Sequence, residues 1–272
     1  MRDVIGFVLV TYTASWLFFA AAGWWTHAEG ASPGSAAVRS VLFMMGTVAP
    51  TGVALAWTAR GRGREAVTAL LRRLVQWHPD WRWWLFAAGY MATIKLLVAV
   101  AHRIIAGAWP TFGTEPWYVI VGAMLLSTVV GGQAGEELGW RGFALPRLQS
   151  RLGMARASLL LGVVWAVWHL PFFFIPGVDK YGQSFPFYAL QVIALSVAMA
   201  CLYAHTNGSL LLAMFMHSAV NQTKGIVSSA LPDPGNVFAL RAPLPGWLTL
   251  GFLWLGAIIC LRLLPKDGRR DG

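Results

Sequence analysis

Long apolar stretches dominate the sequence, and short polar segments separate them. Most stretches have about 17 to 25 residues, the length that a helix needs to cross a hydrocarbon core of about 30 Å. The pattern therefore predicts eight membrane-spanning helices. They lie at residues 4–25, 37–57, 83–106, 117–135 or beyond, 157–175, 186–204, 209–225 and 247–264.

The composition supports lipid as the solvent for most of the chain. Hydrophobic residues make up 57% of the sequence and charged residues 12%, with 11 aspartates and glutamates among 272 residues. We therefore expect an all-α fold, a polytopic membrane helical bundle of about eight transmembrane helices. No internal repeat or long linker divides the chain, so residues 1–272 are expected to form a single membrane domain.

The net charge of +10 could indicate a nucleic-acid partner, but the placement of the basic residues explains it better. Cytoplasmic loops of membrane proteins are enriched in lysine and arginine. With a cytoplasmic N-terminus, eight crossings place 15 of the 21 basic residues inside, including the groups at 60–82, 141–156 and 262–270. We therefore expect a multi-pass protein of the cell membrane with both termini cytoplasmic, in contact with membrane lipid and not with nucleic acid.

Two adjacent carboxylates end the fourth apolar stretch, in the segment GGQAGEELGWRGFALPRLQ. Glu137 and Arg141 are four residues apart, so a helix places them on one face, where they can form an ion pair. Glu136 then points elsewhere and remains free to handle a proton. On these residues alone, a helix end wetted by water at the cytoplasmic interface explains the two acids equally well.

Three further polar residues, His169, His217 and Asn221, lie inside apolar stretches. A lone histidine there is more often a satisfied packing residue, but these groups would each need a separate buried partner. Counted at about 1.5 Å per residue, they lie about 12 to 18 Å from the cytoplasmic ends of their helices. Glu136 reaches that depth if the fourth helix continues, ending before Pro146. One shared polar site in a cytoplasm-facing cavity is therefore expected.

Lys95 lies near the middle of the third stretch. A charged residue at that depth is costly unless a partner or a cavity compensates for it. Lys95 can pair with an acid of the site or extend its amine to the interface, and a structural role is the favoured interpretation.

Glycine and tryptophan add expectations about packing. Gly131, Gly132 and Gly135 permit a bend or a close helix contact just before the two carboxylates. Most of the 15 tryptophans flank the apolar stretches, which indicates interfacial belts, and Trp165 is an exception.

The polar set suits amide hydrolysis. A carboxylate and a histidine that converge on one water can remove its proton and generate a nucleophile. A second histidine and an asparagine can donate hydrogen bonds to the oxyanion of a tetrahedral intermediate. Glu136, His169 and His217 could instead hold a zinc ion that activates the water. HExxH and GxSxG are absent, and no aspartate lies within a predicted span.

Three motifs occur in order on successive predicted helices. They are EExxxR at Glu136, Glu137 and Arg141, aromatic-xxx-histidine at Trp165 and His169, and HxxxN at His217 and Asn221. This ordered trio resembles the CPBP family, the CAAX protease and bacteriocin-processing family of intramembrane endopeptidases, which includes the prenyl-protein endopeptidases. The resemblance implies a catalytic core at residues 131–222.

The resemblance also implies a role for each matched residue. The roles are water activation by Glu136 and His169, oxyanion stabilisation by His217 and Asn221, and support of the site by Glu137 and Arg141. Whether a metal takes part stays open, because the family has been argued both ways. Trp165 stands where phenylalanine is usual in the family, which keeps an aromatic wall and is expected to change little.

The expected function is therefore an intramembrane endopeptidase that acts on a peptide or protein substrate, including a lipidated or membrane-bound one. The alternative is a non-catalytic membrane protein, either a proton-coupled transporter or a bacteriocin immunity or scaffolding protein. Intramembrane glutamate, histidine and lysine residues also mark proton pathways, and the resembled family contains members with scaffolding or immunity roles.

Overall fold

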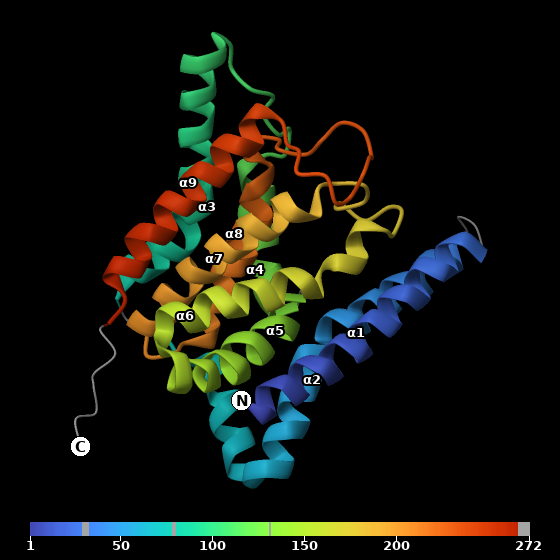
Figure 1. The fold of residues 1–272 in the computed structure, drawn as a ribbon, viewed down its shortest axis with the longest axis vertical. Helices are drawn as coiled ribbons and strands as arrows, with labels where there is room; N and C mark the ends of the chain where they lie inside the picture. Colours follow the sequence, from blue (N-terminus) through green and yellow to red (C-terminus); the bar gives the residue numbers. More distant parts are fainter. Residues whose placement is uncertain (29–32, 78–79, 131, 266–272) are drawn as a thin grey trace.

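The computed structural model describes residues 1–28, 33–77, 80–130 and 132–265, which form helices joined by loops (Figure 1). The α-helices are α1 (Arg2–Ala28), α2 (Pro33–Arg72), α3 (Trp81–Ala106), α4 (Trp117–Val130), α5 (Gly132–Glu137), α6 (Leu145–Trp168), α7 (Phe185–His205), α8 (Leu210–Thr223) and α9 (Leu244–Leu263). The predicted all-α class is confirmed, since these residues contain only one isolated β-bridge, Phe112 to Val227. Gly131 and the basic residues Lys266, Arg269 and Arg270 lie outside the described residues.

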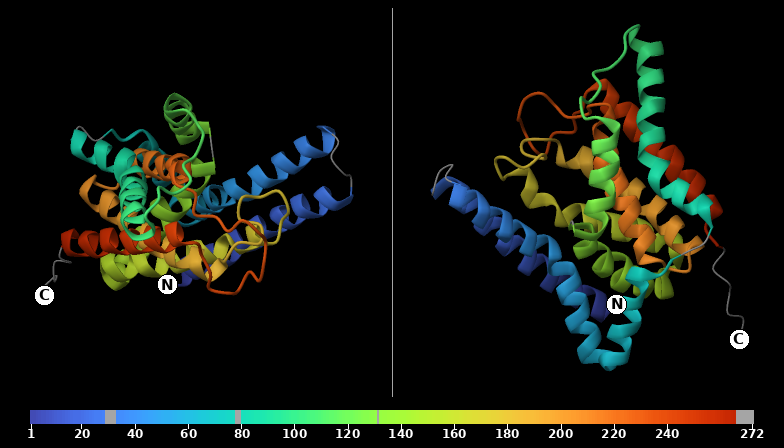
Figure 2. Two further views of the ribbon diagram at one scale, coloured as in Figure 1. Left: turned by 90° about the horizontal axis from the view of Figure 1, so that it is seen from above. Right: turned by 180° about the vertical axis from the view of Figure 1, so that it is seen from behind.

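Four short helical segments complete the chain. They are the 3₁₀ turns η1 (Arg73–Val75), η3 (Leu170–Phe173) and η4 (Lys224–Ile226), and the π-helix η2 (Leu138–Ala144). The helices α1 and α2 form a hairpin that extends away from the rest of the bundle (Figures 1 and 2). Phe7 of α1 joins this hairpin to η2, with ring centroids 5.6 Å from Trp140 and 4.8 Å from Phe143.

Six helical segments are long and apolar enough to cross a membrane, judged by length and composition. They are Arg2–Trp25, Ala36–Val75, Trp81–Ala106, Gly132–Trp168, Phe185–His205 and Leu244–Leu263. The helices α4 and α8 have 14 residues each, fewer than the roughly 20 that a full crossing needs. The chain is therefore a multi-pass membrane bundle, but the predicted count of eight crossings is not confirmed.

The helix that carries the two carboxylates continues past Arg141, as predicted, but it does not end before Pro146. The chain widens into η2 and then enters α6 with Pro146 in its first turn. Proline is tolerated there because the first backbone amides of a helix have no intrahelical acceptor. The break comes at Gly153, whose φ of 76° and ψ of 161° divide α6. A positive φ favours glycine, which has no Cβ to clash.

Two glycines let the carboxylate segment pack directly against the backbone of α2. A Cβ at Gly135 would lie 2.9 Å from the carbonyl oxygen of Thr47, and one at Gly139 would lie 2.7 Å from the backbone of Pro50. Gly135 thus makes the close helix contact that the sequence indicates. Small residues at helix interfaces permit this approach in membranes, where tight packing replaces the hydrophobic drive of water.

Three tryptophans lie in the protein core and not in an interfacial belt. Trp140 and Trp168 are fully buried and pack edge to face with ring centroids 6.0 Å apart. Trp165 is buried one turn before the end of α6. The interpretation of tryptophans as belt residues is therefore wrong for Trp140 and Trp168, which anchor η2 against α6.

We predict that Gly139→Ala lowers the free energy of unfolding by about 1–3 kcal/mol, because the added methyl group overpacks the contact with Pro50. Thermal unfolding of the protein in detergent measures this change. Gly122→Ala is the matched control, because nothing lies within 4 Å of a Cβ at Gly122 on α4. Equal midpoints for the two variants would contradict the prediction.

Candidate active site

A cavity of about 680 Å³ lies among α3, α5, α6, α7 and α8 and the loops that follow α6 and α8. Four of the six predicted site residues line it: Glu136, His169, His217 and Asn221. The other two, Glu137 and Arg141, are fully buried and are not among its lining residues. The fold thus brings residues from three helical segments to one cavity.

Glu136 sits at the end of α5, where η2 begins, and its side chain is oriented by a tryptophan. The indole Nε1 of Trp165 donates a hydrogen bond of 2.7 Å to Oε2 of Glu136. Glu136 is buried but reaches the cavity. Because Oε2 is held in this way, Oε1 is the oxygen that can accept a proton from a group in the cavity.

His169 caps the C-terminal end of α6 and lies against the same tryptophan. Its Nδ1 is 2.8 Å from the backbone carbonyl oxygen of Trp165. A carbonyl can only accept, so Nδ1 carries the proton and Nε2 of the neutral ring keeps a lone pair. The ring of Tyr188 on α7 packs edge to face against the imidazole, with centroids 5.4 Å apart. His169 therefore has the tautomer of a base.

Behind the cavity wall, Glu137 links two residues through one oxygen. Its Oε1 accepts hydrogen bonds of 2.9 Å from Nη1 of Arg141 and from Nδ1 of His217. The Arg141 guanidinium also lies over the ring of Trp165, 4.1 Å from the centroid. The predicted i,i+4 ion pair is therefore present, and it has a third member that the spacing of the motif did not indicate.

Two features of the site were missed by sequence reasoning. Trp165 is more than an aromatic wall, because its N–H reaches Glu136, a bond that phenylalanine cannot make. The expectation that this departure changes little is therefore wrong for the geometry. The indole N–H was the available signal. Tyr188 carried no signal, since it is one aromatic residue in an apolar helix.

Lys95 also lines the cavity, although the sequence favoured a structural role. Its side chain is 2% exposed, so the amine does not extend to the interface. Within the described part of the chain no ion pair joins it to an acid, and its Nζ bonds to the hydroxyls of Ser229 and Thr249.

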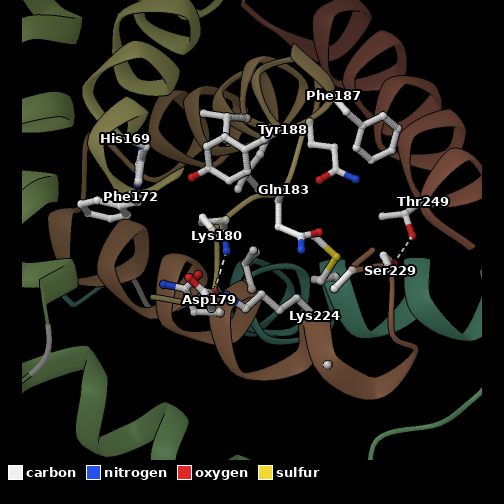
Figure 3. Close-up of a pocket in the computed structure, with 18 of the residues that line it drawn as sticks. His169, Phe172, Asp179, Lys180, Gln183, Phe187, Tyr188, Lys224, Ser229 and Thr249 are labelled. Carbon is white, nitrogen blue, oxygen red and sulfur yellow. Dashed lines mark hydrogen bonds and ion pairs between the residues drawn. The ribbon is translucent and has the colours of Figure 1, made fainter. Parts of the chain in front are cut away.

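The mouth of the cavity carries a small ionic cluster that joins the loop before α7 to η4 (Figure 3). Asp179 Oδ2 lies 2.6 Å from Nζ of Lys180 and 2.8 Å from Nζ of Lys224. Although partial burial opposes the effect, the two lysines hold the pKa of the Asp179 carboxyl below its usual range. Burial, followed by the charge of Lys224, lowers the pKa of Lys180 to about 8.

The mouth of the cavity is formed at one end of the bundle, by the loop before α7, by η4 and by the segment leading to α9. The arginine-rich end of α2 lies at the opposite end of α7, where Arg73 donates to Tyr203 and to the carbonyl of Gly208. The loops that line the cavity and the arginine-rich end of α2 therefore lie at opposite ends of α7.

The donor set does not fit the zinc alternative. Among the residues that the structure describes, no group of three or more histidine, cysteine, aspartate or glutamate side chains is placed to hold a metal ion.

Comparisons with known proteins find similarity in the part of the chain that carries the predicted site residues. Residues 114–223 match the model described as Type II CAAX prenyl endopeptidase Rce1-like. A curated relative, CAAX prenyl protease 2 from Methanococcus maripaludis, is 30% identical over 99 residues. These residues cover 34% of this chain and 36% of the relative, so the alignment spans about a third of each protein. The matched region contains all six predicted site residues.

We predict that Glu137→Gln destabilises the protein by about 3–5 kcal/mol, because it leaves the charge of Arg141 buried without compensation. Thermal unfolding in detergent reports the loss. Asp179→Asn is the control for loss of a carboxylate, since that side chain is 56% exposed and its ion pairs are expected to contribute at most about 1 kcal/mol. A midpoint for Glu137→Gln that matches the control would rule out a structural contribution of the buried pair.

Proposed function

We propose that this chain, whose residues 114–223 match the Rce1-like model of CAAX endopeptidases, is an intramembrane endopeptidase that hydrolyses a peptide bond at the cavity. The observation that carries the proposal is the convergence of Glu136, His169, His217 and Asn221 on that cavity. The family match supports the same reaction class. The roles in water activation and oxyanion stabilisation are inferred from hydrogen-bond geometry.

In the proposed reaction, Glu136 and His169 bind one water between them. Oε1 of Glu136 and Nε2 of His169 are the atoms with free lone pairs. One of them accepts the water proton, and the other accepts a hydrogen bond that orients the water. The bond from Trp165 keeps the Glu136 carboxylate from rotating away. The water oxygen then attacks the carbonyl carbon, and the abstracted proton later passes to the leaving amine. The products are a carboxylic acid and an amine.

His217 and Asn221 would stabilise the oxyanion of the intermediate, as the helical spacing of one turn allows. Nδ1 of His217 faces the Glu137 carboxylate, which fixes the direction of the ring and leaves Nε2 as the nitrogen that can face the cavity. Arg141 holds that carboxylate in place. In this proposal Glu137 and Arg141 are positioning residues, because they act through His217.

The substrate class proposed is a peptide or protein segment delivered within the membrane. Aromatic and aliphatic side chains, among them Phe172, Phe187 and Leu195, line much of the cavity and suit apolar residues of such a segment. A prenylated peptide of the CAAX type is the first probe to test, since the curated relative is named for that substrate.

We propose further that the protein lies in the cell membrane with its arginine-rich end in the cytoplasm and the mouth of the cavity on the other side. The arginines at 60–73 and 147–156 occupy the end away from the mouth, and cytoplasmic ends of membrane proteins carry such an excess. This arrangement keeps the expected cytoplasmic termini and replaces the expected cytoplasm-facing cavity.

We predict that Glu136→Gln abolishes peptide cleavage, because an amide cannot accept the proton of the water. In one experiment, the purified protein in liposomes is incubated with a farnesylated CAAX peptide. In a second, membranes from cells that express the unchanged protein or Glu136→Gln are compared by mass spectrometry of new peptide ends. Glu115→Gln, a change at an exposed glutamate outside the site, is the control and retains activity.

Turnover by Glu136→Gln at the rate of the unchanged protein would overturn the proposed mechanism. A protein that yields no new peptide ends but gives proton flux dependent on Glu136 in liposomes would instead be a transporter.

Orientation is tested by single cysteines on the buried-thiol background of Cys201 and Cys260. Ser228→Cys at the exposed mouth of the cavity should react with a membrane-impermeant maleimide in intact cells. Arg151→Cys at the exposed arginine-rich end should react only after permeabilisation. The reverse labelling pattern would contradict the proposed orientation.

A further inference from the structure

Lys95 is a buried cation that the proposed hydrolysis does not use. It lies on α3, and its Nζ donates hydrogen bonds to Ser229 Oγ at 2.6 Å and to Thr249 Oγ1 at 3.2 Å. Thr249 donates its own hydroxyl proton to the carbonyl of Pro245, 2.7 Å away, so its lone pair faces the amine. Ser229 and Thr249 therefore fix the position of Nζ on the wall of the cavity.

A purely structural role does not explain the charge. A neutral amide could bridge the same two hydroxyls without the cost of placing an ammonium in a membrane protein. An ammonium has three donors, and two hydroxyl bonds leave one of them. No carboxylate of the described residues forms an ion pair with Lys95, so an anion that enters the cavity is the natural partner.

The surroundings of Lys95 favour an anion as well. Four basic residues line the cavity, Lys95, Lys180, Lys224 and Arg241, against two acids, Glu136 and Asp179. Asp179 is already paired with Lys180 and Lys224 at the mouth. The lining of the cavity therefore has an excess of positive charge, which attracts an anionic group.

Figure 3 shows His169 on one side of the pocket and Ser229 with Thr249 on the other, with Lys180 and Gln183 between them. A peptide whose reacting carbonyl lies beside His169 can thus extend across the pocket towards Ser229. Lys95 and Thr249 are both buried, where α3 packs against α9. The end of a peptide needs less space at such a buried position than a chain that continues past it, which favours a terminal group over a side chain.

We propose that Lys95, held by Ser229 and Thr249, forms an anion-binding subsite that receives a carboxylate of the peptide, and that this carboxylate is the one at the end of the chain. This proposal rests on the proposed endopeptidase function, because that function supplies the peptide. Binding of the peptide at Lys95 does not require cleavage. The subsite would favour peptides with a free C-terminus over peptides with a blocked one.

The test measures binding without chemistry, using the Glu136→Gln protein in nanodiscs. Three fluorescein-labelled apolar octapeptides of otherwise equal sequence are compared by fluorescence anisotropy. One ends in a free carboxylate, one in a carboxamide, and one in a carboxamide after a final aspartate. The free acid should bind about tenfold more tightly than the amide, as expected for a charge-assisted hydrogen bond in a desolvated site.

Lys95→Met, made in the Glu136→Gln protein, should bring the ratio of acid to amide affinity close to one, and Lys95→Arg should retain a preference for the acid. Lys224→Met is the control, because it removes a positive charge from the exposed mouth of the same cavity. The Lys224→Met protein should keep its preference for the acid. That preference should also depend less on salt than a preference caused by a general positive field at the surface.

Equal affinity for acid and amide in the protein with Lys95, including no binding of either, overturns the proposal. An acid preference that Lys95→Met leaves unchanged also overturns the proposal. If the thermal midpoint of the Lys95→Met protein is lowered as well, Lys95 is identified as a structural residue. Binding of the aspartate peptide as tight as that of the free acid supports the subsite but overturns the assignment to a terminal carboxylate. The separate cleavage experiment with Glu136→Gln tests the proposed function. Its outcome does not change how these binding ratios are interpreted.

Discussion

The fully buried ion pair of Glu137 and Arg141 is the interaction on which the rest of the site depends. Neither charge has access to solvent, so each is tolerated only because the other lies 2.9 Å away. Further contacts of the pair extend to two other helices, through His217 on α8 and through the ring of Trp165 on α6. Fixing this pair therefore fixes the positions of three segments that are far apart in the sequence, and the cavity forms where they meet. The π-helical turn at η2 begins just after Glu137 and contains Arg141, as is frequent at functional sites.

Trp165 is the second centre of the arrangement. Its indole N–H binds Glu136, its backbone carbonyl binds His169, and its ring lies between Arg141 and His217. One residue therefore contacts both the carboxylate and the base proposed to activate water, as well as the histidine proposed to stabilise the oxyanion. A phenylalanine here would keep the ring contacts and lose the donor to Glu136. The tryptophan at this position thus determines how the carboxylate is held.

The cavity has chemically different sides. Glu136 and His169 lie near the tryptophan, where a base is needed, whereas Lys95 bonds to two hydroxyls, one of them from Thr249 on α9. Apolar walls connect the two regions. A peptide bound across such a cavity would be oriented by its charge at one end and cut at the other, which is how binding energy far from the reacting bond can position that bond.

The sequence by itself determined the membrane class and the all-α fold, because long apolar stretches have few alternatives in lipid. It also indicated the resemblance to one family, because the three motifs have fixed spacing. It also determined the ion pair of Glu137 and Arg141, since four residues on one helix are neighbours by geometry. Only the tertiary structure decided that His217 joins this pair, that Trp165 donates to Glu136, that Pro146 lies inside a continuing helix and that the mouth of the cavity lies away from the arginine-rich end. Those features depend on contacts between segments separated by tens of residues, whose mutual rotation and depth are set by packing such as that of Gly135 and Gly139 on α2. Periodicity along one helix carries no information about that rotation.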